Sequence, residues 1–262
     1  MTRIKPVILV GGLNTKNWPL SYHFHLKQFI KLDNNQSLLQ ETIVRGLPFG
    51  KPVIVIHEPY AKIAIDQVKE LGIKADIIIE PIPKSSGPCA IIATFFAKQK
   101  KTSKILLLPV DHHVLKMKKY LSITTNMIDS SSPFSMIGVK PNTTDAGYDY
   151  VKAAEIVNEG IYKNNQLITK LSEYKRQQYL ADKQYFWNTG IYLIDVEFML
   201  DKTQAFQSLL YNQVLDSLSQ AVIVNKCIIP EKTSYNNIIE ISVEQITAKY
   251  IKEMLLFTTE IA

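Results

Sequence analysis

Short apolar runs alternate with amphipathic segments through the first half of the chain. A near-continuous apolar run is typical of a strand buried on both faces, and apolar residues at helical spacing are typical of a helix that covers such a sheet. The runs predict strands at Pro6–Val10, Pro52–His57, Asp76–Glu80, Lys104–Pro109 and Phe134–Val139. The helical spacing predicts helices at Ser37–Leu47, Pro59–Leu71, Pro88–Lys100 and Lys118–Ser130. This alternation predicts an α/β fold with a mostly parallel sheet and helices on both faces.

The pattern changes in the second half. Polar and apolar residues alternate along Tyr148–Val157 and Ile161–Leu171, which predicts an antiparallel hairpin with the Asn164–Asn165 pair as its turn. A short helix at Lys175–Lys183 and a strand at Phe186–Asp195 are expected next. The remainder, residues 196–256, is mostly helical by period. Because no linker-like stretch interrupts the chain, we expect residues 1–262 to form a single domain.

Composition narrows the class of protein. Hydrophobic residues make up 46% of the chain and charged residues 21%, which is ordinary for a globular protein, and no apolar run approaches the length of a membrane span. Cys89 and Cys227 lie too far apart for a metal motif or a disulfide framework, and no signal peptide is recognisable, so we expect a cytoplasmic protein. The net charge of +6 suits a phosphate-bearing small substrate. The lysines are scattered rather than striped, which argues against a nucleic-acid partner.

The loop after the first strand is a candidate phosphate site. Gly11 and Gly12 follow the strand directly, then come Thr15 and Lys16, with Lys27 further on. Glycine lets bare backbone N–H groups approach an anion, and lysine neutralises it. Two glycines after a strand are also an ordinary turn, so both interpretations stay open at this stage.

Two other loops should meet the first one, because ligands of open parallel sheets bind beyond the carboxyl ends of the strands. The third strand is followed by polar residues: Glu80, Lys84, Ser85 and Ser86. The fourth is followed by Asp111, His112 and His113, and the second ends at His57 and Glu58. Asp111 suits Mg²⁺, which takes oxygen ligands and often pairs one carboxylate with substrate phosphates. Its alternative role is a helix N-cap.

Six segments of the chain carry a specific resemblance. In order they are GGLNTKNWPLS with LKQF, EPIPKSSGPCAIIAT, PVDHHV, DAGYDYV, FWNTGIYLI and ISVEQITAK. In these segments the chain resembles the bacterial mannose-1-phosphate guanylyltransferases (GDP-mannose pyrophosphorylases), within the sugar-nucleotide pyrophosphorylase family. The resemblance runs in the family's order over nearly all 262 residues.

The resemblance implies a Rossmann-like nucleotide-diphospho-sugar transferase fold and an enzyme. The implied reaction joins GTP and mannose 1-phosphate into GDP-mannose and pyrophosphate, by in-line attack of the sugar phosphate on the α-phosphorus, with Mg²⁺ as cofactor.

The resemblance also implies a set of site residues. In this sequence the implied triphosphate-binding and catalytic residues are Gly11, Gly12, Thr15, Lys16 and Lys27, and the implied metal ligand is Asp111. The implied base-binding residues are Glu80 and Pro88, and those that face the sugar phosphate are Gly147, Glu173 and Asn188.

Several positions depart from the family's pattern. Asn14, Lys16 and Leu26 stand where the family has Gly, Arg and Pro, and Tyr174 and Asp149 replace a lysine and a glycine. Glu244 stands for an aspartate, and we expect the chain to end before the family's WSDVG segment and its C-terminal β-helix. An alternative interpretation is therefore an inactive homologue that retains nucleotide or protein binding. The assembly stays open, with a homodimer as one alternative.

Overall fold

One mixed β-sheet runs through the computed structural model, which describes residues 3–10, 27–31, 35–144, 147–163, 165–169 and 171–259. Its strands are ordered β11-β12-β3-β2-β1-β4-β10-β5-β13-β8-β7, and β6 and β9 pair beside β10. The strands of the first half are β1 (Ile4–Val10), β2 (Val53–His57), β3 (Asp76–Glu80), β4 (Lys104–Pro109) and β5 (Phe134–Val139). Those of the second half are β6 (Tyr150–Lys152), β7 (Glu155–Asn158), β8 (Ile161–Lys163), β9 (Gln166–Ile168), β10 (Tyr185–Asp195), β11 (Val222–Val224), β12 (Cys227–Ile229) and β13 (Leu255–Thr259).

The α-helices lie between these strands. They are α1 (Leu38–Gly46), α2 (Ala61–Glu70), α3 (Ser86–Gln99), α4 (Met117–Asp129), α5 (Glu173–Ala181), α6 (Val196–Phe206), α7 (Ser208–Ser219), α8 (Lys232–Asn236) and α9 (Val243–Thr247). Short 3-10 turns occur at Lys27–Phe29, Leu47–Phe49, Glu58–Tyr60 and Ile251–Glu253.

The centre of the sheet is parallel, as the apolar runs predicted. β2, β1 and β4 pair in parallel, with Val7 opposite Val53 and Leu107. β3 extends the parallel set on the other side of β2. The fold class predicted from the sequence is confirmed, and the carboxyl ends of β1, β2, β3 and β4 come to one edge because all four strands point the same way.

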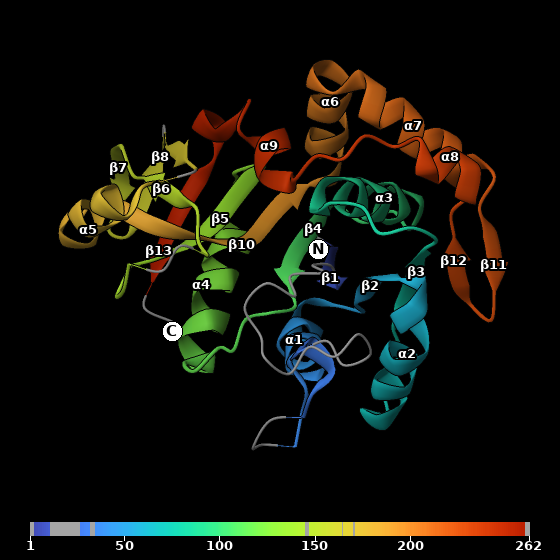
Figure 1. The fold of residues 1–262 in the computed structure, drawn as a ribbon. Coiled ribbons are helices and arrows are strands. Elements are labelled where there is room, and N and C mark those ends of the chain that lie inside the picture. The colour runs from blue at the N-terminus through green and yellow to red at the C-terminus, as the bar shows by residue number, and fades with distance from the viewer. Residues whose placement is uncertain are drawn as a thin grey trace.

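Helices cover both faces of this sheet (Figure 1). One apolar cluster joins the sheet to α3, α6, α7 and α9, and a second cluster on the opposite face joins it to α1, α2 and α4. α3 is apolar around most of its surface, and its residues from Gly87 to Ala97 are all buried. That burial explains why its sequence shows little amphipathic pattern.

Two parts of the second half differ from the sequence prediction. The antiparallel hairpin exists, but β7 and β8 are joined through Gly160 at φ +70, and Asn165 instead donates from Nδ2 to the main-chain oxygens of Tyr162 and Met254. The segment after β10 is mostly helical, as predicted, but it also contains the β11–β12 hairpin and the start of β13, which the sequence did not indicate.

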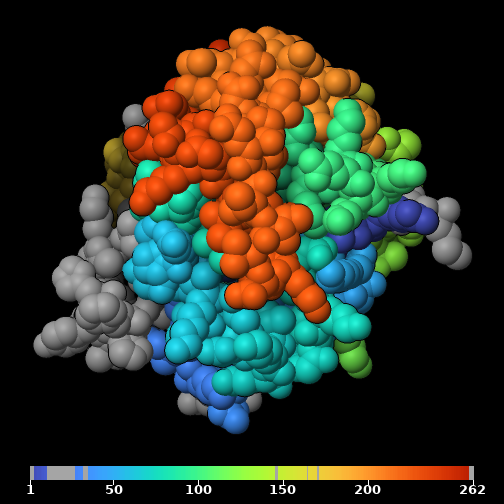
Figure 2. Space-filling view, turned by 90° about the vertical axis from the view of Figure 1, so that its right-hand side faces the viewer, coloured from blue at the N-terminus to red at the C-terminus, as the bar shows by residue number. Residues whose placement is uncertain are grey.

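The β11–β12 hairpin forms one edge of the sheet, in orange in Figure 2, where β12 pairs in parallel with β3. All three residues of β11 are exposed, so no buried face imposed an alternating pattern that the sequence could reveal.

No helix among the residues that the structure describes is long and apolar enough to cross a bilayer.

Candidate active site

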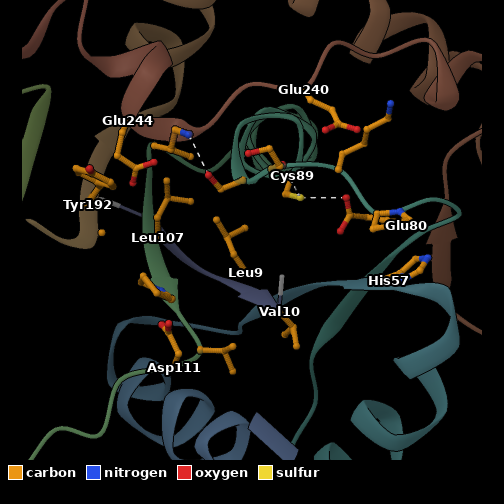
Figure 3. Close-up of a pocket in the computed structure, with 18 of the residues that line it drawn as sticks. Leu9, Val10, His57, Glu80, Cys89, Leu107, Asp111, Tyr192, Glu240 and Glu244 are labelled. Atoms are coloured by element: carbon orange, nitrogen blue, oxygen red, sulfur yellow. Dashed lines mark hydrogen bonds between the residues drawn. The ribbon is translucent and has the colours of Figure 1, made fainter. Parts of the chain in front are cut away.

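A pocket of about 640 Å³ opens where the central strands end. Its floor consists of Leu9 and Val10 of β1 and Leu107 of β4 (Figure 3). Polar residues after β3 and β4 form two of its sides, namely Glu80, Lys84, Ser85, Ser86 and Asp111. The predicted meeting of the loops after the third and fourth strands is thus confirmed, and the end of β1 and His57 at the end of β2 join them. The loop after the first strand, residues 11–26, lies outside the described residues.

Glu80 lies at one end of the pocket, beside His57. Its side chain is 2% exposed, and its Oε1 accepts hydrogen bonds from Cys89 Sγ at 3.0 Å and from the hydroxyl of Tyr235. Burial raises the pKa of Glu80, while the bonds from Cys89 and Tyr235 and from the main chain of Lys84 act to lower it. The same desolvation raises the pKa of the Cys89 thiol well above its usual value, so Cys89 serves as a donor and not as a nucleophile.

Asp111 lies on another side of the pocket, and its side chain is 51% exposed. The loop that carries it is fixed by α1. The buried guanidinium of Arg45 donates to the main-chain oxygens of Pro109 at 2.8 Å and His112 at 2.7 Å. Glu41, one turn earlier on α1, pairs with His113 Nδ1 at 2.8 Å. The backbone on both sides of Asp111 is thereby held in place.

His112 points into the protein, and His113 pairs outward with Glu41. Burial lowers the pKa of His112 to about 4, and the nearby charges of Arg45 and Lys27 act in the same direction, while Asp111 opposes them. The charge of Lys27, which begins the 3-10 turn Lys27–Phe29, thus acts on the residue next to Asp111.

Asn188 lies on β10, next to the residues Gly190 and Tyr192 that form the third side of the pocket. The side-chain Nδ2 of Asn188 donates a hydrogen bond to the hydroxyl of Tyr192 at 2.8 Å. Its Oδ1 accepts a hydrogen bond from the main-chain N–H of Gly190 at 2.9 Å. Gly190 has φ +67 at a register shift in β10, and a Cβ there would meet Pro109 Cγ at 2.9 Å. Because Gly190 and Tyr192 line the pocket, the hydrogen bonds of Asn188 hold these two residues in position.

One carboxylate lines this wall, and a second is close enough for its pKa to respond to the first. Glu244, at the start of α9, lines the pocket near Tyr192. Asp149 is half-buried, and burial followed by the charge of Glu244 raises its pKa. This end of the pocket is consequently acidic and rich in hydroxyl and amide groups, which are the groups that hydrogen-bond sugars.

The segment before α9 closes the remaining side. Gly87 N donates to Ile241 O at 3.0 Å, and Ser86 Oγ accepts from Val243 N at 3.0 Å. A Cβ on Gly87 would lie 2.4 Å from Ile241 O, so only glycine permits this contact. It brings Glu240, Val243 and Glu244 onto the pocket.

The structure brings together some of the predicted site residues and not others. Glu80 and Asp111 line the pocket, and Asn188 supports the pocket wall. Lys27 is not among the residues that line the pocket, but its charge acts on His112. Pro88 is buried on α3 between the pocket residues Ser86 and Cys89.

Two more predicted residues lie away from the pocket, and four fall outside the described residues. Gly147 lies in an exposed turn before β6, and Glu173 is exposed at the first turn of α5, a helix that contacts β6 through Tyr179 and Tyr150 (Figure 1). Gly11, Gly12, Thr15 and Lys16 lie outside the described residues.

Sequence reasoning missed four contributors to the site. Arg45 and Tyr235 are buried polar residues on helices, Tyr192 follows Asn188 along a strand, and Glu240 lies in a loop. Only Tyr192 carried a usable signal, because it lies four residues after Asn188 in the FWNTGIYLI segment.

These features define a class of protein. A mostly parallel sheet, covered on both faces and with a polar pocket at the carboxyl ends of its central strands, is the architecture of α/β proteins that bind nucleotides and other phosphorylated ligands. The chain belongs to the nucleotidyl transferase family, whose model matches residues 5–225.

Curated relatives carry more specific names. A protein of Escherichia coli named mannose-1-phosphate guanylyltransferase is 32% identical over 218 residues, which cover 77% of this chain and 46% of the relative. The xanthan biosynthesis protein XanB of Xanthomonas campestris pv. campestris is 30% identical over 213 residues, which cover 79% of this chain and 45% of that protein. The chain thus spans about half the length of the curated relatives it matches.

Solved structures share the fold. A Thermus thermophilus protein named mannose-1-phosphate geranyltransferase superposes with a TM-score of 0.85 at 16% identity, over 100% of this chain and 75% of that one. A Helicobacter pylori protein named mannose-6-phosphate isomerase gives a TM-score of 0.83 at 15% identity, over 98% of this chain and 97% of that one.

Proposed function

We propose that this chain is a mannose-1-phosphate guanylyltransferase, which forms GDP-mannose and pyrophosphate from GTP and mannose 1-phosphate in the cytoplasm. The observation that carries the proposal is the division of one pocket into three chemically different sides. A buried carboxylate lies at one end, an exposed carboxylate near a lysine lies on a second side, and a hydroxyl-rich wall lies on the third. These sides suit a base, a triphosphate and a sugar.

Glu80 favours guanine among the bases. A carboxylate only accepts hydrogen bonds, and the pairing edge of guanine offers two adjacent donors, N1–H and N2–H. Uracil and thymine offer one N–H between two carbonyl oxygens, which a carboxylate repels, and adenine offers an unprotonated N1 beside its amino group. The names of the curated relatives support the same nucleotide and sugar.

Asp111 is suited to bind Mg²⁺ as the one carboxylate ligand that the protein supplies. No group of three His, Cys, Asp or Glu side chains able to hold a metal occurs among the described residues. Mg²⁺ does not need such a group, because it commonly binds one or two carboxylates together with substrate phosphates and water. Bound there, Mg²⁺ would neutralise part of the triphosphate charge.

The residues of this chain would act mainly by positioning and charge. A phosphate oxygen of mannose 1-phosphate forms a bond to the α-phosphorus of GTP, and the bond from that phosphorus to the bridging oxygen breaks, so pyrophosphate leaves with the electron pair. Lys27 would offset negative charge near Asp111. Tyr192, aligned by Asn188, would hydrogen-bond the sugar at the opposite wall.

Coupled detection of pyrophosphate tests the proposal. Purified protein should release pyrophosphate from GTP only when mannose 1-phosphate and Mg²⁺ are both present, and GDP-mannose should appear in equal amount. Calorimetry with GTP alone separates the alternatives. Binding without turnover would contradict the enzymatic proposal and favour an inactive nucleotide-binding homologue, which the Asp149–Glu244 pair of like charges would explain. A sedimentation measurement checks whether the chain is a homodimer.

A further inference from the structure

Tyr235 connects the C-terminal part of the chain to the nucleotide end of the pocket. It lies on α8, 155 residues after Glu80, and its side chain is 0% exposed. Its hydroxyl donates to Glu80 Oε1, the same oxygen that accepts from Cys89 Sγ. Two helices, α8 and α3, therefore hold one oxygen of one carboxylate.

This arrangement determines which part of Glu80 is available to a ligand. Each carboxylate oxygen accepts about two hydrogen bonds. Oε1 is filled by Tyr235 and Cys89, the main-chain N–H of Lys84 also bonds the carboxylate, and the second oxygen is turned toward the pocket (Figure 3). A ligand must consequently present its N–H donors to that second oxygen alone.

We propose that Tyr235 is a positioning residue for base selection, which fixes Glu80 so that its second oxygen accepts an N–H donor of a guanine base. This inference rests on the proposed function. It assigns part of the nucleotide specificity to a residue that lies beyond the part of the chain matched by the family model.

The position of the Tyr235 hydroxyl is itself fixed. α8 begins at Glu231, whose carboxylate accepts from the main-chain N–H groups of Thr233 and Ser234. The side chain of Lys84, which follows β3, donates to Asn236 O at 3.0 Å. Burial raises the pKa of Tyr235, so its hydroxyl keeps its proton and remains a donor throughout the accessible pH range.

The charge of Glu80 depends on the same contacts. The groups that face Glu80 are Cys89 from α3, Tyr235 from α8, the main-chain N–H of Lys84, and His57, its register partner on β2; Glu240 lines the same pocket. Burial disfavours the carboxylate, and the donors favour it. Removing the Tyr235 hydroxyl should therefore raise the pKa of Glu80, and binding that needs the carboxylate should be lost at a higher pH than in the wild type.

The test compares Tyr235→Phe with Tyr250→Phe. Tyr250 is also buried, at 2% exposed, but its hydroxyl contacts Met199 Sδ at 3.4 Å, away from the pocket. GTP and ATP binding are measured by calorimetry without sugar phosphate, so the result does not depend on turnover. Because a hydrogen bond to a charged group is worth about 1.5–3 kcal/mol, we expect Tyr235→Phe to weaken GTP about tenfold or more. The affinity of Tyr235→Phe for ATP should change little, and Tyr250→Phe should match the wild type in its affinity for both nucleotides.

Two further measurements exclude a merely structural effect. In the background of Glu80→Gln, Tyr235→Phe should have no additional effect on GTP affinity, because the carboxylate that Tyr235 positions is gone. As the pH is lowered, the GTP affinity of Tyr235→Phe should fall at a higher pH than that of the wild type. An unchanged GTP affinity in Tyr235→Phe, an equal loss of GTP and ATP, or a full additional loss in the Glu80→Gln background would each overturn the inference. Failure of the wild type to bind GTP would instead refute the proposed function.

Discussion

Replacing Arg45 with Met would remove the support of the Asp111 loop. The guanidinium is 1% exposed and donates to Pro109 O at 2.8 Å and His112 O at 2.7 Å. Among the described residues, no carboxylate lies within ion-pair distance of it, and burial lowers its pKa. Arg45 is thus a buried charge whose partners are main-chain dipoles on either side of Asp111.

The size of the expected stability loss follows from these contacts. Each buried carbonyl left without a donor costs about 1–3 kcal/mol. Part of that cost is offset because the substitution also removes a buried charge that has no ion-pair partner among the described residues. We expect Arg45→Met to lower the free energy of unfolding by about 2 kcal/mol, or to lower Tm by about 4–8 °C. Arg45→Lys should fall between Met and the wild type, because an ammonium lacks the planar fork that reaches two carbonyls.

Urea unfolding followed by circular dichroism measures the loss, and paramagnetic resonance of Mn²⁺ measures divalent binding at Asp111. Arg176 provides a matched control, since it donates to Thr144 O at 3.0 Å and Leu171 O at 2.6 Å but is less buried and lies on α5. Arg176→Met should leave Mn²⁺ affinity unchanged, whereas Arg45→Met should weaken it. Wild-type stability and wild-type Mn²⁺ affinity in Arg45→Met would refute the reasoning.

Three more changes test other parts of the pocket. Gly87→Ala should force the Ile241 main chain away from α3, lower the free energy of unfolding by about 1–3 kcal/mol and weaken GTP binding. An unchanged melting temperature together with an unchanged GTP affinity by calorimetry would contradict the role of this contact. Asn188→Ala and Tyr192→Phe should each raise KM for the sugar phosphate, with a coupling of about 0.5–1.5 kcal/mol in a double-mutant cycle, and additive effects would show that the two side chains act separately. Asp111→Ala should abolish turnover while GTP binding without metal persists; retained activity would remove the metal role assigned to it.

The parallel centre of the fold was predictable because burial on both faces leaves a local signal. β3, β4 and β5 begin and end where their apolar runs predicted. The helix that begins after Ser37 was marked by its cap, and Ser37 and Gln40 form a capping box. The β11–β12 hairpin was missed because its outer strand is apolar yet exposed, so it lacks the alternation that marks a strand with one buried face.

The site was predictable only where it follows a strand. Glu80 and Asp111 were found because the carboxyl ends of parallel strands meet at one edge. Arg45 and Tyr235 were not found, because a basic residue in the last turn of a helix and a tyrosine in a short helix are ordinary at the level of sequence. Their importance comes from contacts made 64 and 155 residues away, to Pro109 and Glu80, which no local pattern encodes.

Simultaneous measurement of pyrophosphate and GDP-sugar formation tests the central claim most directly. With GTP, mannose 1-phosphate and Mg²⁺, the wild type should form both products in equal amounts, and Asp111→Ala should form neither. Absence of both products with the wild type, while calorimetry shows that it binds GTP, would contradict the assignment of this chain as a guanylyltransferase.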